Sequence, residues 1–173
     1  MTGSRPGRRG ARSTGRHHAA RLAAVQALYQ VEMTGQSLSS VIEEFVGHRL
    51  GQSDVESSRG ARANEPLFRQ LVRGTGGRIA EFDGLIRPLL AEGWKVERLE
   101  VVLRCILRLG TFEMVARPEV PAAVVIKEYV DLADDFFSEN EPAMVNGILD
   151  RLARQCRPGE LEARHEGTAQ PTG

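Results

Sequence analysis

Residues 97–114 read ERLEVVLRCILRLGTFEM, and this stretch decides the fold class. Its apolar side chains recur every three or four positions, at Leu99, Val102, Leu103, Ile106 and Leu109. Such spacing places them on one face of an α-helix, whereas a half-buried strand would alternate apolar and polar residues. The stretch therefore predicts an amphipathic helix that packs against other helices.

The same helical period governs the chain before this stretch. It predicts a first helix over about residues 14–33, which is apolar on two sides and therefore central, with Gly35 as its stop. A second helix is expected from Ser40, because Ser40 and Glu43 fit the Ser-x-x-Glu capping box. Residues 51–64 have no such period and are expected to form a solvated loop.

A third helix is expected to start at Asn64, with Pro66 in its first turn, and to continue to Phe82. Three glycines lie inside this helix, at Gly74, Gly76 and Gly77. They permit either the close approach of another helix or a kink, and the sequence leaves both open. A short helical piece at 85–90, interrupted by Pro88, is expected to follow.

Beyond the central stretch, residues 117–121 contain two prolines and predict a rigid connector, because proline fixes φ and cannot continue a helix. Helical spacing resumes at residues 124–136 and again at 145–152. No segment shows the alternation typical of strands. The sequence therefore predicts an all-α fold.

The chain of 173 residues is long enough for one hydrophobic core. We expect a single compact helical domain of about seven helices over residues 16–156. Residues 1–15, rich in Gly, Arg and Ser, are expected to be a flexible, disordered basic arm. Residues 157–173 are polar and are expected to be a disordered tail.

Charge is distributed unevenly along the chain. The segment that precedes Glu32 holds six arginines and no acid, while all 23 acidic residues lie from Glu32 onward. Arginine makes up 21 of the 23 basic residues, and its side chain is suited to bidentate phosphate contacts and to stacking on bases. A cationic segment on a slightly acidic body indicates a polyanionic partner, and we expect nucleic acid.

Several other classes of protein are not expected. No apolar run approaches the ~20 residues of a membrane span, and the N-terminal segment lacks the apolar core of a secretory signal. An organellar transit peptide is the alternative there, but four glycines in the first fifteen residues oppose an amphipathic helix. The two cysteines, Cys105 and Cys156, are far apart and are expected to be reduced thiols in a cytoplasmic protein.

No pattern of residues indicates catalysis. The four histidines are not spaced with Cys, Asp or Glu as metal ligands would be. The glycines near residue 75 lack the lysine of a phosphate-binding loop, and no Gly-x-Ser-x-Gly elbow is present. We expect no catalytic residue, no metal and no cofactor, and therefore no enzyme.

A basic cluster runs from the arm into the first predicted helix and contains Arg12, Arg16, His17, His18 and Arg21. Its like charges repel one another, and cations at a helix N-terminus oppose the macrodipole. An anionic partner would explain why the cluster is kept, although it could also serve only solubility. Tyr29 is either a core tyrosine or a partly exposed platform on which an unpaired base stacks.

Charged residues also fall among the buried-looking positions of the central helix, at Arg104, Arg108 and Glu113. One interpretation is intramolecular pairing, with Glu128 as a potential partner, because buried charges must be paired. The other interpretation is a protein-binding face.

These segments resemble the NusB family of bacterial transcription antitermination factors over roughly residues 16–155. The resemblance rests on several segments in family order: AVQALY (24–29), LFRQLVRG (67–74), LRLGTFE (107–113), VP (120–121), IKEYVDLA (126–133) and VNGILD (145–150).

The resemblance implies a fold of about seven helices whose Arg-rich N-terminal motif binds boxA RNA in ribosomal RNA leaders. It also implies NusE, a ribosomal protein, as partner within an RNA polymerase antitermination complex. Carried over by position, the RNA side would include Arg16 to Arg21, Gln26 and Tyr29, with Met144 and Asn146 near it. The face through Arg108 and Phe112, with Arg104 and Glu113, would be the candidate for NusE.

The chain departs from the family pattern at two places that bear on RNA. His17-His18-Ala19 stands where consecutive arginines are common, and Met144 stands where an aromatic residue is usual. Two alternative functions stay open. One is a helical protein-binding adaptor. The other is a relative of the N-terminal domain of a ribosomal RNA cytosine methyltransferase, although we expect too little chain for the methyltransferase fold itself. Apolar helix faces would also permit a homodimer.

Overall fold

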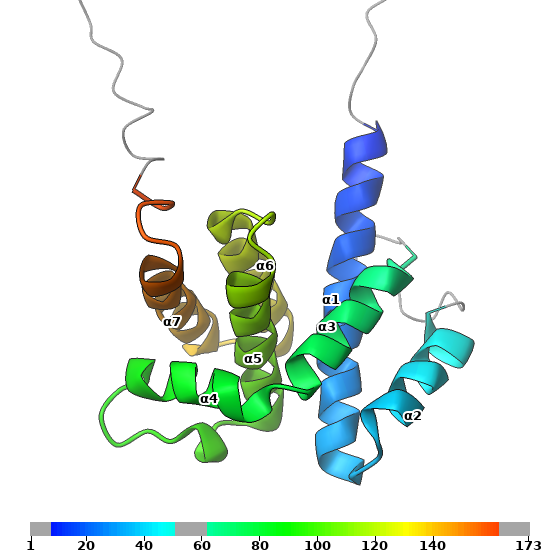
Figure 1. Cartoon of the computed structure of the whole chain (residues 1–173), viewed down its shortest axis with the longest axis horizontal. Helices are drawn as coiled ribbons and strands as arrows, with labels where there is room; N and C mark the ends of the chain where they lie inside the picture. Colours follow the sequence, from blue (N-terminus) through cyan, green and yellow to red (C-terminus); the bar gives the residue numbers. More distant parts are fainter. Residues whose placement is uncertain (1–7, 51–61, 163–173) are drawn as a thin grey trace, which may run out of the picture. The chain divides into compact units, whose positions relative to one another are not determined.

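The computed structural model describes residues 8–50 and 62–162, with side chains from Thr14 onward. Within these residues the chain forms seven α-helices and no β-strand (Figure 1). The helices are α1 (Arg8–Thr34), α2 (Leu38–Glu44), α3 (Glu65–Gly76), α4 (Ile79–Ile86), α5 (Val101–Ala116), α6 (Ala122–Phe136) and α7 (Glu141–Cys156). The all-α fold predicted from the helical spacing is confirmed.

The chain divides after Gly77 into two compact units, the first with α1 to α3 and the second with α4 to α7. The sequence did not indicate this division, and the single domain over residues 16–156 stays a prediction.

In the first unit, α1 is the longest helix and contacts both α2 and α3. Figure 1 shows α3 crossing α1, with α2 beside them. The rings of Phe45 and Phe68 stack with their centroids 5.6 Å apart in the core. Gly35 ends α1 at φ +71°, a conformation that favours glycine, and its N–H donates to the Val31 carbonyl, as its role of stop predicts.

Two predicted helix starts in this unit need correction. α1 begins at Arg8, so residues 8–15 of the expected disordered arm are helical; residues 1–7 lie outside the described part. α2 begins at Leu38 instead of Ser40, because Ser37 is its cap: extended in conformation, Ser37 accepts a hydrogen bond from the Ser40 N–H at 3.1 Å.

The third predicted helix starts as expected but is shorter. Asn64 accepts a hydrogen bond from the Leu67 N–H at 3.0 Å, which confirms the cap. α3 then ends at Gly76, and α4 begins at Ile79. A Cβ on Gly76 would clash with the methyl groups of Leu38, so this glycine lets α2 approach α3. Of the two interpretations of the glycines, the close approach of another helix is the one that holds at this position.

In the second unit, α5 contacts α4, α6 and α7 and is buried from Leu103 to Met114. Gly110 admits α7, because a Cβ there would lie 2.9 Å from the Leu149 side chain. α5 starts at Val101, four residues later than predicted, after a 3₁₀ turn over Val96–Arg98. A second 3₁₀ turn, Arg87–Leu89, contains Pro88 and follows α4.

The segment after α7 corrects the predicted start of the disordered tail. The Arg157 side chain is 7% exposed and donates to four carbonyl oxygens, those of Glu113, Met114, Arg117 and Val120. Glu160 accepts a hydrogen bond at 2.7 Å from the N–H of Ala122, the first residue of α6. Residues 157–162 therefore pack against the α5–α6 connector, and residues 163–173 lie outside the described part.

Candidate nucleic-acid interface

The structure divides the predicted basic cluster of α1 into exposed and buried members. Arg16 is exposed and His17 is half-buried, whereas His18 and Arg21 are only 3% and 4% exposed. The helical period explains the difference, since His18 and Arg21 share the buried side of α1 with Val25 and Leu28. Both buried side chains interact within the chain, so of these four residues Arg16 has the most surface to offer a phosphate.

The start of α1 at Arg8 also changes the argument from the helix dipole. The dipole acts mainly within the first turn, which contains Arg8 and Arg9. Arg16 lies two turns further along the helix, where a cation meets little of that opposition. The side chain of Arg12 lies outside the described residues, so its predicted contact with RNA stays a prediction.

A separate, half-exposed stripe lies further along α1, about a third of a turn around the helix from Arg16. Its members are spaced by four, three and four residues, which keeps them on one side of the helix: Leu22, Gln26, Tyr29 and Met33. Tyr29 is 40% exposed, so the alternative of a core tyrosine is wrong. An exposed aromatic ring on a basic helix is the arrangement that base stacking requires.

The two glutamines of this part of α1 differ in their hydrogen bonds within the protein. The Gln30 amide nitrogen donates to both Gln36 and Glu44 at 2.9 Å. Gln26 is half-buried and makes no side-chain hydrogen bond with the described residues. Its amide can therefore still donate to and accept from the edge of a base, beside the ring of Tyr29.

The other two predicted RNA residues belong to α7 in the second unit. Asn146 is exposed and Met144 is half-buried. Two residues apart on one helix, they do not lie on the same face. Their role in RNA binding stays a prediction.

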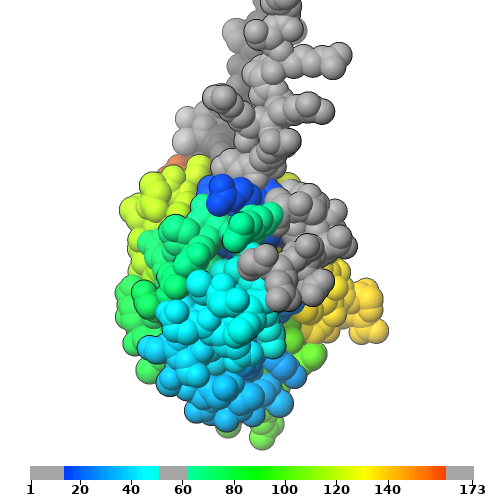
Figure 2. Space-filling view, turned by 90° about the vertical axis from the view of Figure 1, so that its right-hand side faces the viewer, coloured from blue at the N-terminus to red at the C-terminus, as the bar shows by residue number. Residues whose placement is uncertain are grey.

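The fold also brings one basic residue to this surface that the sequence did not indicate. The N–H of Asn64 donates to the Arg16 carbonyl at 3.1 Å, so the segment that enters α3 lies against α1. Figure 2 shows atoms at the start of this segment (green) beside the first described side chains of α1 (dark blue). Arg62 is exposed in this segment, two residues from the contact. Only the tertiary hydrogen bond reveals this neighbour, because the surrounding sequence indicates a loop.

The charged residues predicted as a partner face are buried within the second unit. Arg108 is 9% exposed and binds Asp83 through two hydrogen bonds of 2.7 Å. Arg104 donates to the carbonyl oxygens of Glu97 and Leu99 at 3.1 Å. This confirms intramolecular pairing, the alternative interpretation of these residues.

Glu113 and Phe112 share these surroundings. Glu113 is fully buried and accepts hydrogen bonds from Arg117 at 2.8 Å and from the Tyr129 hydroxyl at 2.5 Å. Phe112 is 5% exposed and packs edge-on against Phe82. Glu128, considered as a pairing partner from the sequence, is also buried, at 6% exposure. A partner face through Phe112 and Glu113 stays a prediction, with little side-chain surface to support it.

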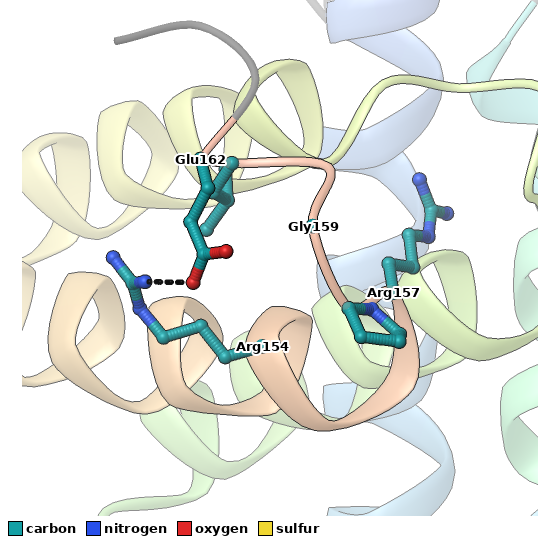
Figure 3. Close-up of a pocket in the computed structure, with 6 residues that line it drawn as sticks. Arg154, Arg157, Gly159 and Glu162 are labelled. Carbon is teal, nitrogen blue, oxygen red and sulfur yellow. Dashed lines mark ion pairs between the residues drawn. The ribbon is translucent and has the colours of Figure 1, made fainter. Parts of the chain in front are cut away.

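The hollow beside the end of α7 offers no catalytic arrangement. Arg154 points toward Glu162 across it and pairs with that carboxylate at 3.5 Å, while Arg157 points away (Figure 3). Among the described side chains, no three Asp, Glu, His or Cys residues gather as metal ligands. No helix in the described part is long and apolar enough to cross a membrane.

Neither cysteine has the properties of a nucleophile. Burial raises the pKa of the Cys105 thiol to about 11, against the smaller opposing effects of Arg108 and Arg104. Cys156 is exposed at the end of α7, but partial desolvation of its thiol still raises its pKa. A raised pKa leaves less of the reactive thiolate at neutral pH.

Comparison with known proteins identifies the family. The sequence model of the NusB family matches residues 18–154. The chain belongs to the NusB family. It is 47% identical over 143 residues to the transcription antitermination protein NusB of Maricaulis maris (strain MCS10), an alignment that covers 83% of this chain and 89% of that protein. The corresponding protein of Agrobacterium fabrum is 45% identical over 139 residues, with 80% and 84% covered.

The solved structure of NusB from T. maritima has the same fold, with a TM-score of 0.68 at 30% identity. That alignment covers 84% of this chain and 96% of the T. maritima chain. The NusB family match includes Gln26 and Tyr29 and begins after Arg16 and His17. Membership places the chain among transcription antitermination proteins.

Proposed function

We propose that this chain binds boxA-type single-stranded RNA of ribosomal RNA operons together with NusE, as a non-enzymatic part of the RNA polymerase antitermination complex. The observation that carries the proposal is the 40% exposure of Tyr29 on a helix whose exposed Arg16 makes no ion pair with a described residue. Arginine would neutralise phosphates, and the tyrosine ring would stack on a base. The absence of acids before Glu32 also supports RNA binding by this helix.

The roles proposed for the individual residues follow from the chemistry of single-stranded RNA. Unpaired bases expose both their faces and their hydrogen-bonding edges, so a stacking ring and a neighbouring amide can select a base. Tyr29 supplies the ring, and Gln26, one turn earlier on the same stripe, supplies the amide. Phosphate contacts by Arg16 would add affinity without sequence preference.

The test is a titration of boxA RNA and a scrambled strand, with and without NusE. We expect the chain to prefer boxA and its affinity to fall as salt rises. NusE should tighten RNA binding, and RNA should tighten NusE binding by the same factor. Equal binding of both strands would overturn boxA recognition. NusE binding without any RNA binding would favour the protein-binding adaptor.

Substitutions at Tyr29 test the stacking role. Tyr29→Ala should weaken boxA binding by about 1–3 kcal/mol, the range for losing one stacked base. Tyr29→Phe keeps the ring and should bind nearly as well as the unaltered chain. Because Tyr29 is 40% exposed, circular dichroism should show unchanged helicity in both variants. An undiminished affinity of Tyr29→Ala would remove the ring from the site.

A further inference from the structure

We propose that Arg62 is a second phosphate-binding arginine, which forms one RNA-binding edge with Arg16. This inference rests on the proposed RNA-binding function and extends it to a part of the chain that lies outside the N-terminal basic cluster. Arg62 is far from Arg16 in the sequence, yet the fold places both at the same edge of the first unit.

A tertiary contact sets the position of Arg62. The Asn64 N–H donates to the Arg16 carbonyl at 3.1 Å, and the Asn64 side chain caps α3. Between these positions, Ala63 is buried at 8% exposure and anchors the segment, while Arg62 remains exposed. The backbone at Arg62 is thus held near Arg16 by a buried neighbour and a hydrogen bond.

No acid among the described residues forms an ion pair with either of these two arginines. The acid closest to Arg62 in sequence, Glu65, pairs with Arg69 at 3.0 Å. Glu43 binds that same Arg69 at 2.7 Å, and this hydrogen bond and charge lower the pKa of Glu43. Neither Arg16 nor Arg62 makes an ion pair with a described residue.

The chemistry of the edge suits a phosphodiester. A phosphate bound by both guanidinium groups would gain attraction from each of them and would lower any repulsion between the two cations. The planar donor fork of arginine matches phosphate oxygens in a bidentate manner. An RNA strand that follows the stripe of Gln26 and Tyr29 would bring its phosphates along this helix, and Arg62 would bind one beside Arg16.

The experiment measures boxA affinity over a range of salt concentrations for Arg62→Ala and Arg73→Ala. Arg73 is a matched control: it is exposed, makes no ion pair with a described residue, and lies about 12 Å along α3 from the start of that helix. Arg62→Ala should weaken binding on the order of five-fold and reduce the salt slope by about 0.7, the value for one phosphate contact on a single strand. Arg73→Ala should change neither quantity.

Different outcomes separate this inference from the proposed function. If the unaltered chain binds boxA and Arg62→Ala binds with the same affinity and slope as Arg73→Ala, the role of Arg62 is wrong and RNA binding stands. If the unaltered chain does not bind boxA, both proposals fail. Arg62→Lys gives a further measure, because it should restore the salt slope but only part of the affinity. A thermal melt confirms that each variant is folded.

Discussion

Two exposed arginines of the first unit and two nearly buried arginines of the second unit have opposite surroundings. At the edge of the first unit, Arg16 and Arg62 are exposed and lack carboxylate partners among the described residues. In the second unit, Arg108 and Arg157 are nearly buried and their donors are occupied by carboxylate or carbonyl oxygens. The same kind of side chain therefore stabilises the fold at Arg108 and Arg157 and remains available to a ligand at Arg16 and Arg62.

The difference between these arginines lies in the carbonyl and carboxylate oxygens that surround each of them. The last turn of a helix leaves carbonyl oxygens without intrahelical donors, and α5 ends in such a turn. Arg157 donates to the Met114 carbonyl of that turn, and also to the Glu113 carbonyl, which already accepts the Arg117 N–H. The carbonyls of α1 around Arg16 bond within the helix, the Arg16 carbonyl also accepts the Asn64 N–H, and no acid precedes Glu32 in the sequence. Arg16 itself makes no ion pair with a described residue.

The largest effect is expected at the Arg108–Asp83 pair. Arg108→Ala should lower the free energy of unfolding by about 3–5 kcal/mol, because it leaves the Asp83 carboxylate without its bidentate partner, at 13% side-chain exposure. Urea denaturation of the variant measures this loss. The control is Arg78→Ala, whose ion pair with Glu81 is half-exposed and should be worth less than about 1 kcal/mol.

The double variant Arg108→Leu/Asp83→Leu sharpens the interpretation. Replacing both members of a buried pair by apolar residues is often near neutral. We therefore expect it to be more stable than Arg108→Ala alone. Equal losses in Arg108→Ala and Arg78→Ala would show that burial does not distinguish these arginines.

A smaller loss, about 2–3 kcal/mol, is expected for Arg157→Ala, because the side chain donates charge-assisted hydrogen bonds to four carbonyl oxygens. A neutral carbonyl that loses this donor costs less than a nearly buried carboxylate left without its cation. Arg154→Ala is the matched control, since Arg154 lies one turn earlier with 50% of its side chain exposed. Thermal melting of both variants provides the measurement, and equal melting temperatures would mean that residues 157–162 contribute little to the second unit.

Helical spacing predicted most of the fold, because apolar periodicity is a local property of the sequence. The Asn64 cap and the proline connector were also predicted correctly, since each depends on residues within a few positions of one another. The start of α1 was misplaced because glycine and serine lower helix propensity without forbidding a helix. The docking of Arg157 depends on carbonyl oxygens about 40 residues away, which no local pattern indicates.

The candidate site was predictable only in part for the same reason. Tyr29 was assigned both alternatives, and its exposure required the packing of the first unit. His18 and Arg21 are basic like Arg16, and the sequence grouped all three as one cluster. The helical period places His18 and Arg21 on the buried side of α1, but that period was applied only to the apolar residues. Arg62 could not be found because one backbone hydrogen bond brings its segment to α1.

The smallest effect on stability is expected at the exposed edge of the first unit. Arg16→Ala should change the free energy of unfolding by less than about 0.5 kcal/mol, as is usual for exposed side chains without special contacts. Alanine has slightly better helix propensity than arginine, so the change can even be stabilising. Urea denaturation checks this value beside that of Arg157→Ala. A loss at Arg16 as large as the loss at Arg157 would make Arg16 part of the fold and remove the contrast between the two units. A near-zero change together with weaker binding to boxA RNA would instead show that the first unit carries this arginine for its ligand.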